Sequence, residues 1–216
     1  MEHAARRSQT NSSRWLVRAL WVLALAGLVY LAALTVWLAV SGLFFPYQLD
    51  YGEGYLLHFV REWSRGEPIY KQAAGYPYIV ANYPPLDIVL ALALVPVLGL
   101  SYAAGRIWTL LAVVAVAGLV AAWVRREGGR WPVAVAAALL LAGSPTIYHW
   151  APLFRVDLPG LALTLGGLYV VAVAYPTGSA PARPRLLWLA VVLFVAGLYA
   201  KQSFLFAPAA AVAYLL

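Results

Sequence analysis

The chain of 216 residues is 64% hydrophobic and only 11% charged, and it contains no cysteine. Soluble domains carry about 25% charged residues, so this chain has too few polar side chains to cover a soluble fold. The composition excludes a disordered protein, a coiled coil and a disulfide scaffold, and the absence of cysteine excludes thiolate catalysis and cysteine-ligated metal centres. The net charge of +7 lies in small groups between apolar runs. That pattern is typical of membrane topology and not of nucleic-acid binding.

Long apolar runs predict an all-α, polytopic bundle of transmembrane helices. A helix needs about 20 apolar residues to cross a bilayer. The predicted spans are residues 16–41, 106–124, 131–150, 158–175, 186–200 and 203–216. Because the last run is still apolar at Leu216, we expect residues 1–216 to be the N-terminal part of a longer transmembrane domain. The first run is about twice as long as the usual 7–15 residues of a signal peptide, which predicts an uncleaved helix with a cytoplasmic N-terminus.

The 13-residue apolar run from Ile88 to Leu100, which contains Pro96, is ambiguous. If it does not cross, nine basic residues lie on the cytoplasmic side and six on the outer side; if it crosses, the numbers are seven and eight. Cytoplasmic loops carry an excess of Lys and Arg, which favours the first arrangement. We therefore predict an outer loop over 42–105. It contains an amphipathic helix over 53–65 and a second helix over 85–100 that lies on or dips into the outer face of the membrane.

This topology places three acidic residues, Asp50, Glu53 and Asp157, at the same outer face. Asp50 and Glu53 have the spacing of a capping box at the start of a helix. Asp157 precedes Pro159 at the start of a predicted span, as an N-cap residue does. Acidic residues close to hydrocarbon are costly and are commonly functional. Capping and catalysis are both open for these residues, and one does not exclude the other.

Cations at the same predicted face are candidates for holding an anionic headgroup. They are Arg106, Arg155 and Lys201. A polar turn at the membrane interface is an equal alternative for Lys201 and Gln202. His58 and His149 stand alone in the sequence, so no metal site is predicted.

Five short motifs follow one another along the chain: LDYGEG at 49–54, RGEPIY at 65–70, NYPPL at 82–86, RVDLP at 155–159 and KQ at 201–202. Their order and spacing cover essentially the whole chain. They resemble the GT-C superfamily of membrane glycosyltransferases, within it the branch of protein O-mannosyltransferases and aminoarabinose transferases. Relatives in that family are longer, with further spans and often an outer C-terminal domain.

The resemblance implies a hexosyl- or pentosyltransferase at the outer face of the plasma (inner) membrane. Its donor would be a polyprenyl-phosphate sugar, and its acceptor a hydroxyl or amine of a glycan, lipid or protein. Asp50 matches the family's catalytic base, with Glu53 as the competing assignment, and Asp157 matches the second acid. The resemblance gives no firm indication of a cofactor and leaves room for a divalent cation.

Tyr83 stands where some relatives have a basic residue, so the family's contact to the donor phosphate does not carry over at that position. The candidate substrate-binding residues are Arg155, Lys201, Gln202, Tyr83 and Arg106. The expected partners are the donor, the acceptor and membrane lipids, without nucleic acid.

A lipid phosphate is a good leaving group, so the enzyme needs chiefly to align the acceptor and remove its proton. We expect a single displacement with inversion, with Asp50 as the base and cations near the departing phosphate. Two alternatives remain. One is a transporter or flippase, whose polar site should lie near the bilayer midplane. The other is a non-catalytic membrane protein in which the acidic residues only cap helices.

Overall fold

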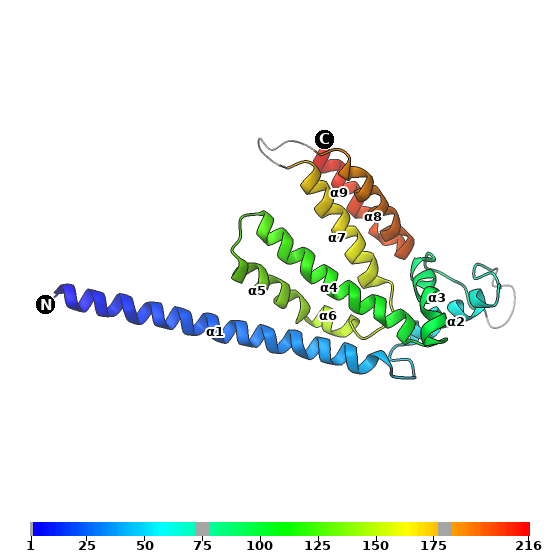
Figure 1. Cartoon of the computed structure of the whole chain (residues 1–216), viewed down its shortest axis with the longest axis horizontal. Helices are drawn as coiled ribbons and strands as arrows, with labels where there is room; N and C mark the ends of the chain where they lie inside the picture. Colours follow the sequence, from blue (N-terminus) through cyan, green and yellow to red (C-terminus); the bar gives the residue numbers. More distant parts are fainter. Residues whose placement is uncertain (1, 72–77, 177–182) are drawn as a thin grey trace.

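The computed structural model describes residues 2–71, 78–176 and 183–216, with the backbone alone for residues 2–13. These ranges are helical and contain no strand, in agreement with the predicted all-α class. The elements are α1 (Glu2–Leu43), α2 (Tyr51–Ser64), α3 (Leu86–Leu98), α4 (Ala103–Arg126), α5 (Trp131–Ala142), α6 (Pro145–Trp150), α7 (Asp157–Ala174), α8 (Leu186–Ala200), the short 3₁₀ helix η1 (Gln202–Leu205) and α9 (Phe206–Leu215) (Figure 1).

Three helices are long and apolar enough to cross a membrane. They are the Arg14–Leu43 part of α1, all of α4 and all of α7. The first two contain the spans predicted over 16–41 and 106–124, and α7 matches the span predicted over 158–175 except that it begins at Asp157 and ends at Ala174. The other apolar helices are shorter, and α8, for example, has 15 residues.

The span predicted over 131–150 is divided into α5 and α6. The break falls at Gly143 and Ser144, where the Ser144 hydroxyl accepts a hydrogen bond from the Ile147 N–H at 3.4 Å. Pro145 follows in the first turn of α6. Proline lacks an N–H and is favoured at such a position, so a new helix begins there instead of the old one continuing. The structure therefore replaces one continuous predicted helix by two.

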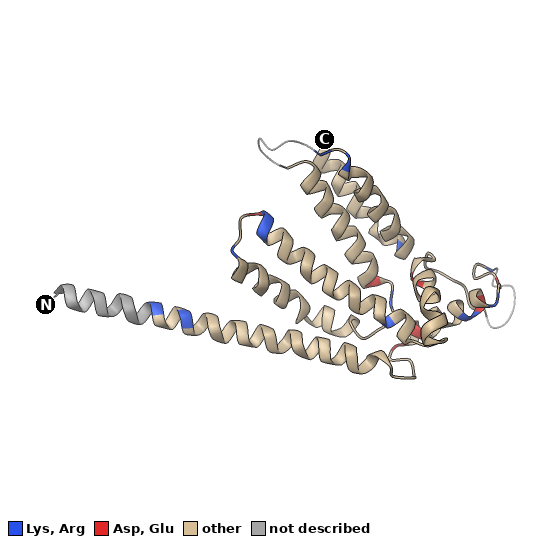
Figure 2. Ribbon diagram, viewed as in Figure 1, with Lys and Arg blue, Asp and Glu red and all other residues tan. Residues whose placement is uncertain are grey.

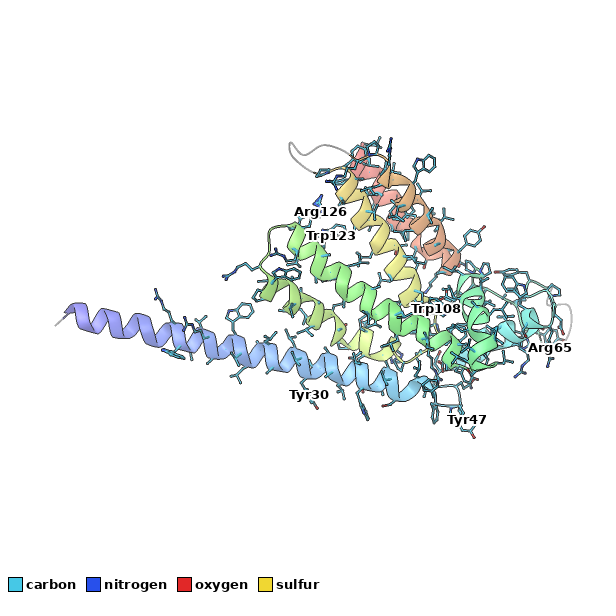
Figure 3. The ribbon with its side chains drawn as sticks, viewed as in Figure 1. Tyr30, Tyr47, Arg65, Trp108, Trp123 and Arg126 are labelled. Carbon is cyan, nitrogen blue, oxygen red and sulfur yellow. The ribbon has the colours of Figure 1, made fainter. Side chains whose placement is uncertain are left out.

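The helices lie side by side in an order that differs from the chain order: α1 runs along α5 and α6, α4 follows, then α7, and α8 and α9 both pack on α7 (Figure 1). Its N-terminal part projects beyond the other helices. The short helices α2 and α3 lie together beside the start of α4, and we call this region the α2–α3 end. Trp108 lies near this end of α4, whereas Trp123 and Arg126 lie at the opposite end (Figure 3).

Buried apolar side chains form three clusters. The cluster at the α2–α3 end holds the two short helices against α4 and against the chain before α7. Its buried members are Leu56, Phe59, Val60, Ile69, Ile88, Ala91, Ala104, Phe154 and Val156. A second cluster joins α1, α4, α6 and α7, and a third joins α7, α8 and α9. Leu56, Phe59 and Val60, which lie on the predicted amphipathic helix over 53–65, thus belong to the core.

Helices α7 and α8 pack closely through small residues. A Cβ atom on Gly167 would lie 2.6 Å from the Phe194 ring, and one on Gly197 would lie 2.5 Å from the Thr164 methyl group. Such small residues let helix backbones approach where lipid supplies no hydrophobic driving force between helices. The close pairing sets the position of Lys201, which directly follows α8.

Candidate functional site

Asp50 caps the N-terminus of α2. Its backbone is extended (φ −140°), and its Oδ2 accepts a hydrogen bond from the Gly52 N–H at 3.0 Å. An N-cap side chain satisfies one of the N–H groups that have no partner within the helix. The predicted capping role of Asp50 is therefore confirmed.

Glu53 does not close the predicted capping box onto the Asp50 N–H. Its carboxylate is completely buried and accepts four other hydrogen bonds. Leu49 N–H donates to Oε2 at 2.6 Å, and Phe154 N–H donates to Oε1 at 2.7 Å. The Arg106 guanidinium donates to both oxygens, each at 2.8 Å. Glu53 thus joins the start of α2 to α4 and to the segment before α7.

Arg106 is the partner of Glu53 and is also buried, with 1% of its surface exposed. All five of its N–H donors are engaged. Beyond the two bonds to Glu53, they reach the backbone carbonyls of Gly42, Phe45 and Tyr47 at 2.7–2.9 Å. The guanidinium also lies 5.0 Å from the centroid of the Tyr102 ring. Neither Glu53 nor Arg106 has a group left to offer to a substrate, so the geometry favours a structural role for both.

Four charged side chains of alternating sign form a row at the α2–α3 end, which we call the charge row. Asp50 Oδ2 accepts from Arg155 Nη1 at 2.6 Å. Arg155 Nε lies 3.8 Å from Asp157 Oδ2, and Asp157 Oδ1 accepts from Lys201 Nζ at 2.6 Å. These residues come from the α2 cap, the segment before α7, the start of α7 and the end of α8. The predicted gathering of these acids and cations is thus observed.

The charge row is partly exposed, unlike the Glu53–Arg106 pair. Its side chains are 12–29% exposed. Asp50 Oδ1 and Arg155 Nη2 have no hydrogen bond to any described residue. The Arg155 guanidinium packs over the Trp150 ring, 5.0 Å from its centroid. The row therefore combines an available carboxylate oxygen with an available guanidinium nitrogen.

The NYPPL segment lies beside Lys201. Lys201 Nζ is 6.0 Å from the centroid of the Tyr83 ring. Gln202 donates from Nε2 to the Asn82 carbonyl at 3.1 Å, and the Tyr70 hydroxyl donates to the Tyr83 carbonyl at 3.0 Å. The structure thus places Tyr83 beside Lys201 of the charge row, and Gln202 is bonded to the neighbouring Asn82.

Asp157 does not cap α7 through its side chain. It is the first residue of the helix, and the cap residue Val156 makes no side-chain cap bond. Asp157 Oδ2 is buried and accepts no hydrogen bond within the described part of the chain. The alternative that Asp157 serves only as an N-cap therefore finds no support in the geometry.

Asp87, in the first turn of α3, was not singled out from the sequence. It is 2% exposed, and its Oδ2 accepts no hydrogen bond from the described residues. Burial, together with the negative charge of Asp157, raises the pKa of the Asp87 carboxyl from 3.8 to about 7. Asp87 follows Pro84 and Pro85 at the start of an apolar run, and this position is the sequence feature that could have identified it as a candidate.

Two cavities lie beside the Asp50–Arg155 ion pair. The first has a volume of about 310 Å³ and is lined by Arg155, Gly52, residues of α2 and residues 78–83. The second has a volume of about 430 Å³ and is lined by Asp50, His149 and residues of α1 and α6. The ion pair therefore has one member in the lining of each cavity. Figure 2 shows the positions of acidic residues, coloured red on the ribbon, at this end of the molecule.

A metal centre is not evident among the described residues. No group of three His, Cys, Asp or Glu side chains is placed to hold an ion there. His58 lies 3.5 Å from Glu62 on α2, and His149 packs against Trp150.

No family model matches the chain, and no similar curated protein or solved structure was found.

Proposed function

We propose that the protein is a polytopic membrane glycosyltransferase that uses a polyprenyl-phosphate sugar as its donor. The acceptor is a hydroxyl or amine of a glycan, lipid or protein, and transfer takes place at the outer face of the plasma membrane. The observation that carries the proposal is the charge row. It presents the available Asp50 Oδ1 and Arg155 Nη2 where two cavities approach each other.

The site has the groups that a single displacement requires. Asp50 Oδ1 takes the proton of the acceptor, and the acceptor atom forms its bond to the anomeric carbon of the sugar. The bond from that carbon to the phosphate oxygen breaks, and the lipid phosphate leaves with the electron pair. Arg155 and Lys201 stabilise its negative charge. Asp157, between these two cations, positions them, and the configuration at the anomeric carbon is inverted.

Hydrogen bonds between residues that precede α3 and residues that follow it in the chain support a common outer face for the charge row. Asp50 and Asn82 precede α3, whereas their partners Arg155 and Gln202 follow it by many residues. With 13 residues, α3 is about 20 Å long, which is shorter than a bilayer core of about 30 Å. A non-crossing α3 places both sides of these contacts at the same membrane face. Basic residues then favour a cytoplasmic N-terminus.

The distribution of charge along the candidate spans disfavours a transporter. Charged residues of α4 and α7 lie in their first or last turns, and those of α1 lie in its N-terminal half. A transport site is expected near the bilayer midplane on broken helices. The polar groups instead gather at the α2–α3 end.

Substitution of the proposed base tests the function. Asp50→Asn keeps an oxygen that can accept from the Gly52 N–H, but it removes the proton acceptor. We expect sugar transfer from polyprenyl-phosphate donors to fall about 10²–10⁴-fold, while binding of the donor persists. Glu62→Gln, an acid on α2 that pairs with Lys71 outside the charge row, is the control. Equal transfer rates for Asp50→Asn and the unaltered protein would contradict the assignment.

A further inference from the structure

We propose that the cavity beside Arg155 binds the sugar of the donor and that this sugar is uncharged, a neutral hexose or pentose rather than an amino sugar. The inference rests on the proposed function. It adds the class of sugar, which the residues that line the cavity indicate.

The lining combines flat apolar surfaces with a few polar groups. Its aromatic members include the four tyrosines Tyr51, Tyr55, Tyr78 and Tyr83. Leu56, Phe59 and Ile88 contribute from the buried cluster beneath. Tyrosine offers a ring face to the C–H groups of a sugar and a hydroxyl to its O–H groups. A lining of this kind with sparse, placed polar groups is typical of small-ligand sites.

The size of the cavity favours a single sugar unit. Its volume of about 310 Å³ lies at the lower end of the range of about 300–1,000 Å³ for ligand pockets. The cavity also reaches the reacting groups, because both Arg155 and Gly52 belong to its lining. Asp50 Oδ2 contacts both of these residues. A sugar in the cavity therefore places its anomeric carbon close to the proposed base.

The charge of the lining selects against an amino sugar. Among the described residues the lining includes the cation Arg155 and no Asp or Glu. Asp50, adjacent to the cavity, already binds Arg155 and the Gly52 N–H through Oδ2. An ammonium group on a ring carbon remote from the anomeric carbon, and so from Asp50 Oδ1, would lose water without gaining a carboxylate partner, and a buried charge without a partner is strongly disfavoured. A neutral sugar has no such cost.

The backbone conformation of Tyr78 is a second feature typical of a ligand site. Its φ of 57° lies in the left-handed region, and no other described residue except glycine has a positive φ. Bulky side chains rarely adopt this conformation, and residues held in it cluster at active sites and ligand clamps. Tyr78 lines the cavity, so this strained residue lies where the sugar is proposed to bind.

The test measures donor binding by the full chain in lipid nanodiscs, through the fluorescence of its nine tryptophans. The probes are polyprenyl-phosphate glucose, arabinose and 4-amino-4-deoxyarabinose. We expect at least tenfold tighter binding of the two neutral donors. Tyr55→Ala should weaken their binding about threefold to tenfold through loss of ring contacts. Tyr30→Ala is the control, because Tyr30 is 67% exposed on α1 and lies away from the other helices (Figure 3).

A charge substitution tests the selectivity directly. Asn82→Asp adds a carboxylate to the lining with almost no change of shape, and it should tighten binding of the amino-sugar donor about tenfold relative to the neutral donors. Tighter binding of the amino sugar by the unaltered protein would overturn the inference, and so would unchanged binding in Tyr55→Ala. Either result leaves the transferase proposal intact. That proposal fails instead if bound donor is never transferred to any acceptor.

Discussion

At the scale of single residues, Asp50 and Glu53 lie only three positions apart but have different surroundings. Glu53 is completely buried and accepts four hydrogen bonds, two of them from Arg106. Asp50 keeps one oxygen available at the edge of a cavity. The same chemical group is therefore structural in one place and available for proton transfer in the other. Their substitutions should affect different properties.

Removal of the charge of Glu53 should destabilise the fold. Glu53→Gln leaves the Arg106 guanidinium buried without its counter-ion, and breaking a buried ion pair in this way costs about 3–5 kcal/mol. Thermal unfolding followed by tryptophan fluorescence should show a lower midpoint. Asp50→Asn is the comparison, because it should strongly lower the rate of transfer with a small effect on the midpoint. An unchanged midpoint for Glu53→Gln would show that the pair does not hold the α2–α3 end together.

Asp87 should make the stability of the fold depend on pH. Its pKa is raised to about 7 in the folded protein, so between pH 4 and pH 7 the folded state holds a proton that the unfolded state releases. Stability should therefore fall as the pH rises through this window, by at most about 4 kcal/mol. Asp87→Asn has no such titration, so its unfolding midpoint should change less from pH 5 to pH 8. Parallel profiles for the two proteins would refute the assignment to Asp87.

At the scale of elements, the first turn of α2 brings Arg155 close to the backbone. A Cβ atom on Gly52 would overlap the Arg155 guanidinium and would lie 2.9 Å from Asp50 Oδ2. Glycine at this position is therefore required by the close approach of a side chain from the segment before α7. The helix gives up some intrinsic stability in return, because glycine is about 1 kcal/mol less favourable than alanine within a helix.

Gly52→Ala should therefore lower activity without lowering stability. The added methyl group displaces Arg155 from Asp50, so sugar transfer should fall at least tenfold, whereas the unfolding midpoint should stay the same or rise. Gly54→Ala is the matched control on the same helix, since its Cβ would meet only the end of the flexible Gln48 side chain. Equal loss of transfer in both variants would point to a general effect on α2 instead.

The sequence predicted several elements well because their signals are local. The α2 cap at Asp50 and the three long apolar helices follow from short-range spacing and composition. The break between α5 and α6 also has a local signal in Ser144–Pro145, but the uncharged residues there do not interrupt an apolar run. Hydropathy alone therefore predicted one span over 131–150.

The candidate site was only partly predictable because its contacts are long-range. The position of Glu53 fits a capping box, yet its donors include Phe154, 101 residues further along the chain. Nothing in the spacing of Glu53 and Arg106 indicates that they form a buried pair. The burial of Asp87 likewise depends on how α3 packs on its neighbours. The charge row was anticipated as a group because the distribution of basic residues indicated which loops share a face.

At the scale of the whole molecule, the proposed topology predicts which residues are accessible from each side of the membrane. The chain has no cysteine, so each introduced cysteine is a unique label. Ser64→Cys and Gln202→Cys should both react with an impermeant maleimide added outside the cell. Glu127→Cys, after α4, should react only once the membrane is permeabilised. Labelling of Ser64→Cys and Gln202→Cys from opposite sides would show that α3 crosses.

The Glu53–Arg106 pair also constrains the order in which the chain is assembled. During synthesis from the N-terminus, Glu53 is made first, Arg106 follows 53 residues later and the Phe154 N–H follows 101 residues later. The carboxylate therefore cannot be buried with all its partners until the segment before α7 has been made. That same segment carries Arg155 to Asp50. The step that surrounds Glu53 with all its partners thus also brings Arg155 to Asp50, whereas Lys201 joins the charge row only after α8 has been made. A nascent chain acquires its proposed base in working form only after the scaffold around it has closed.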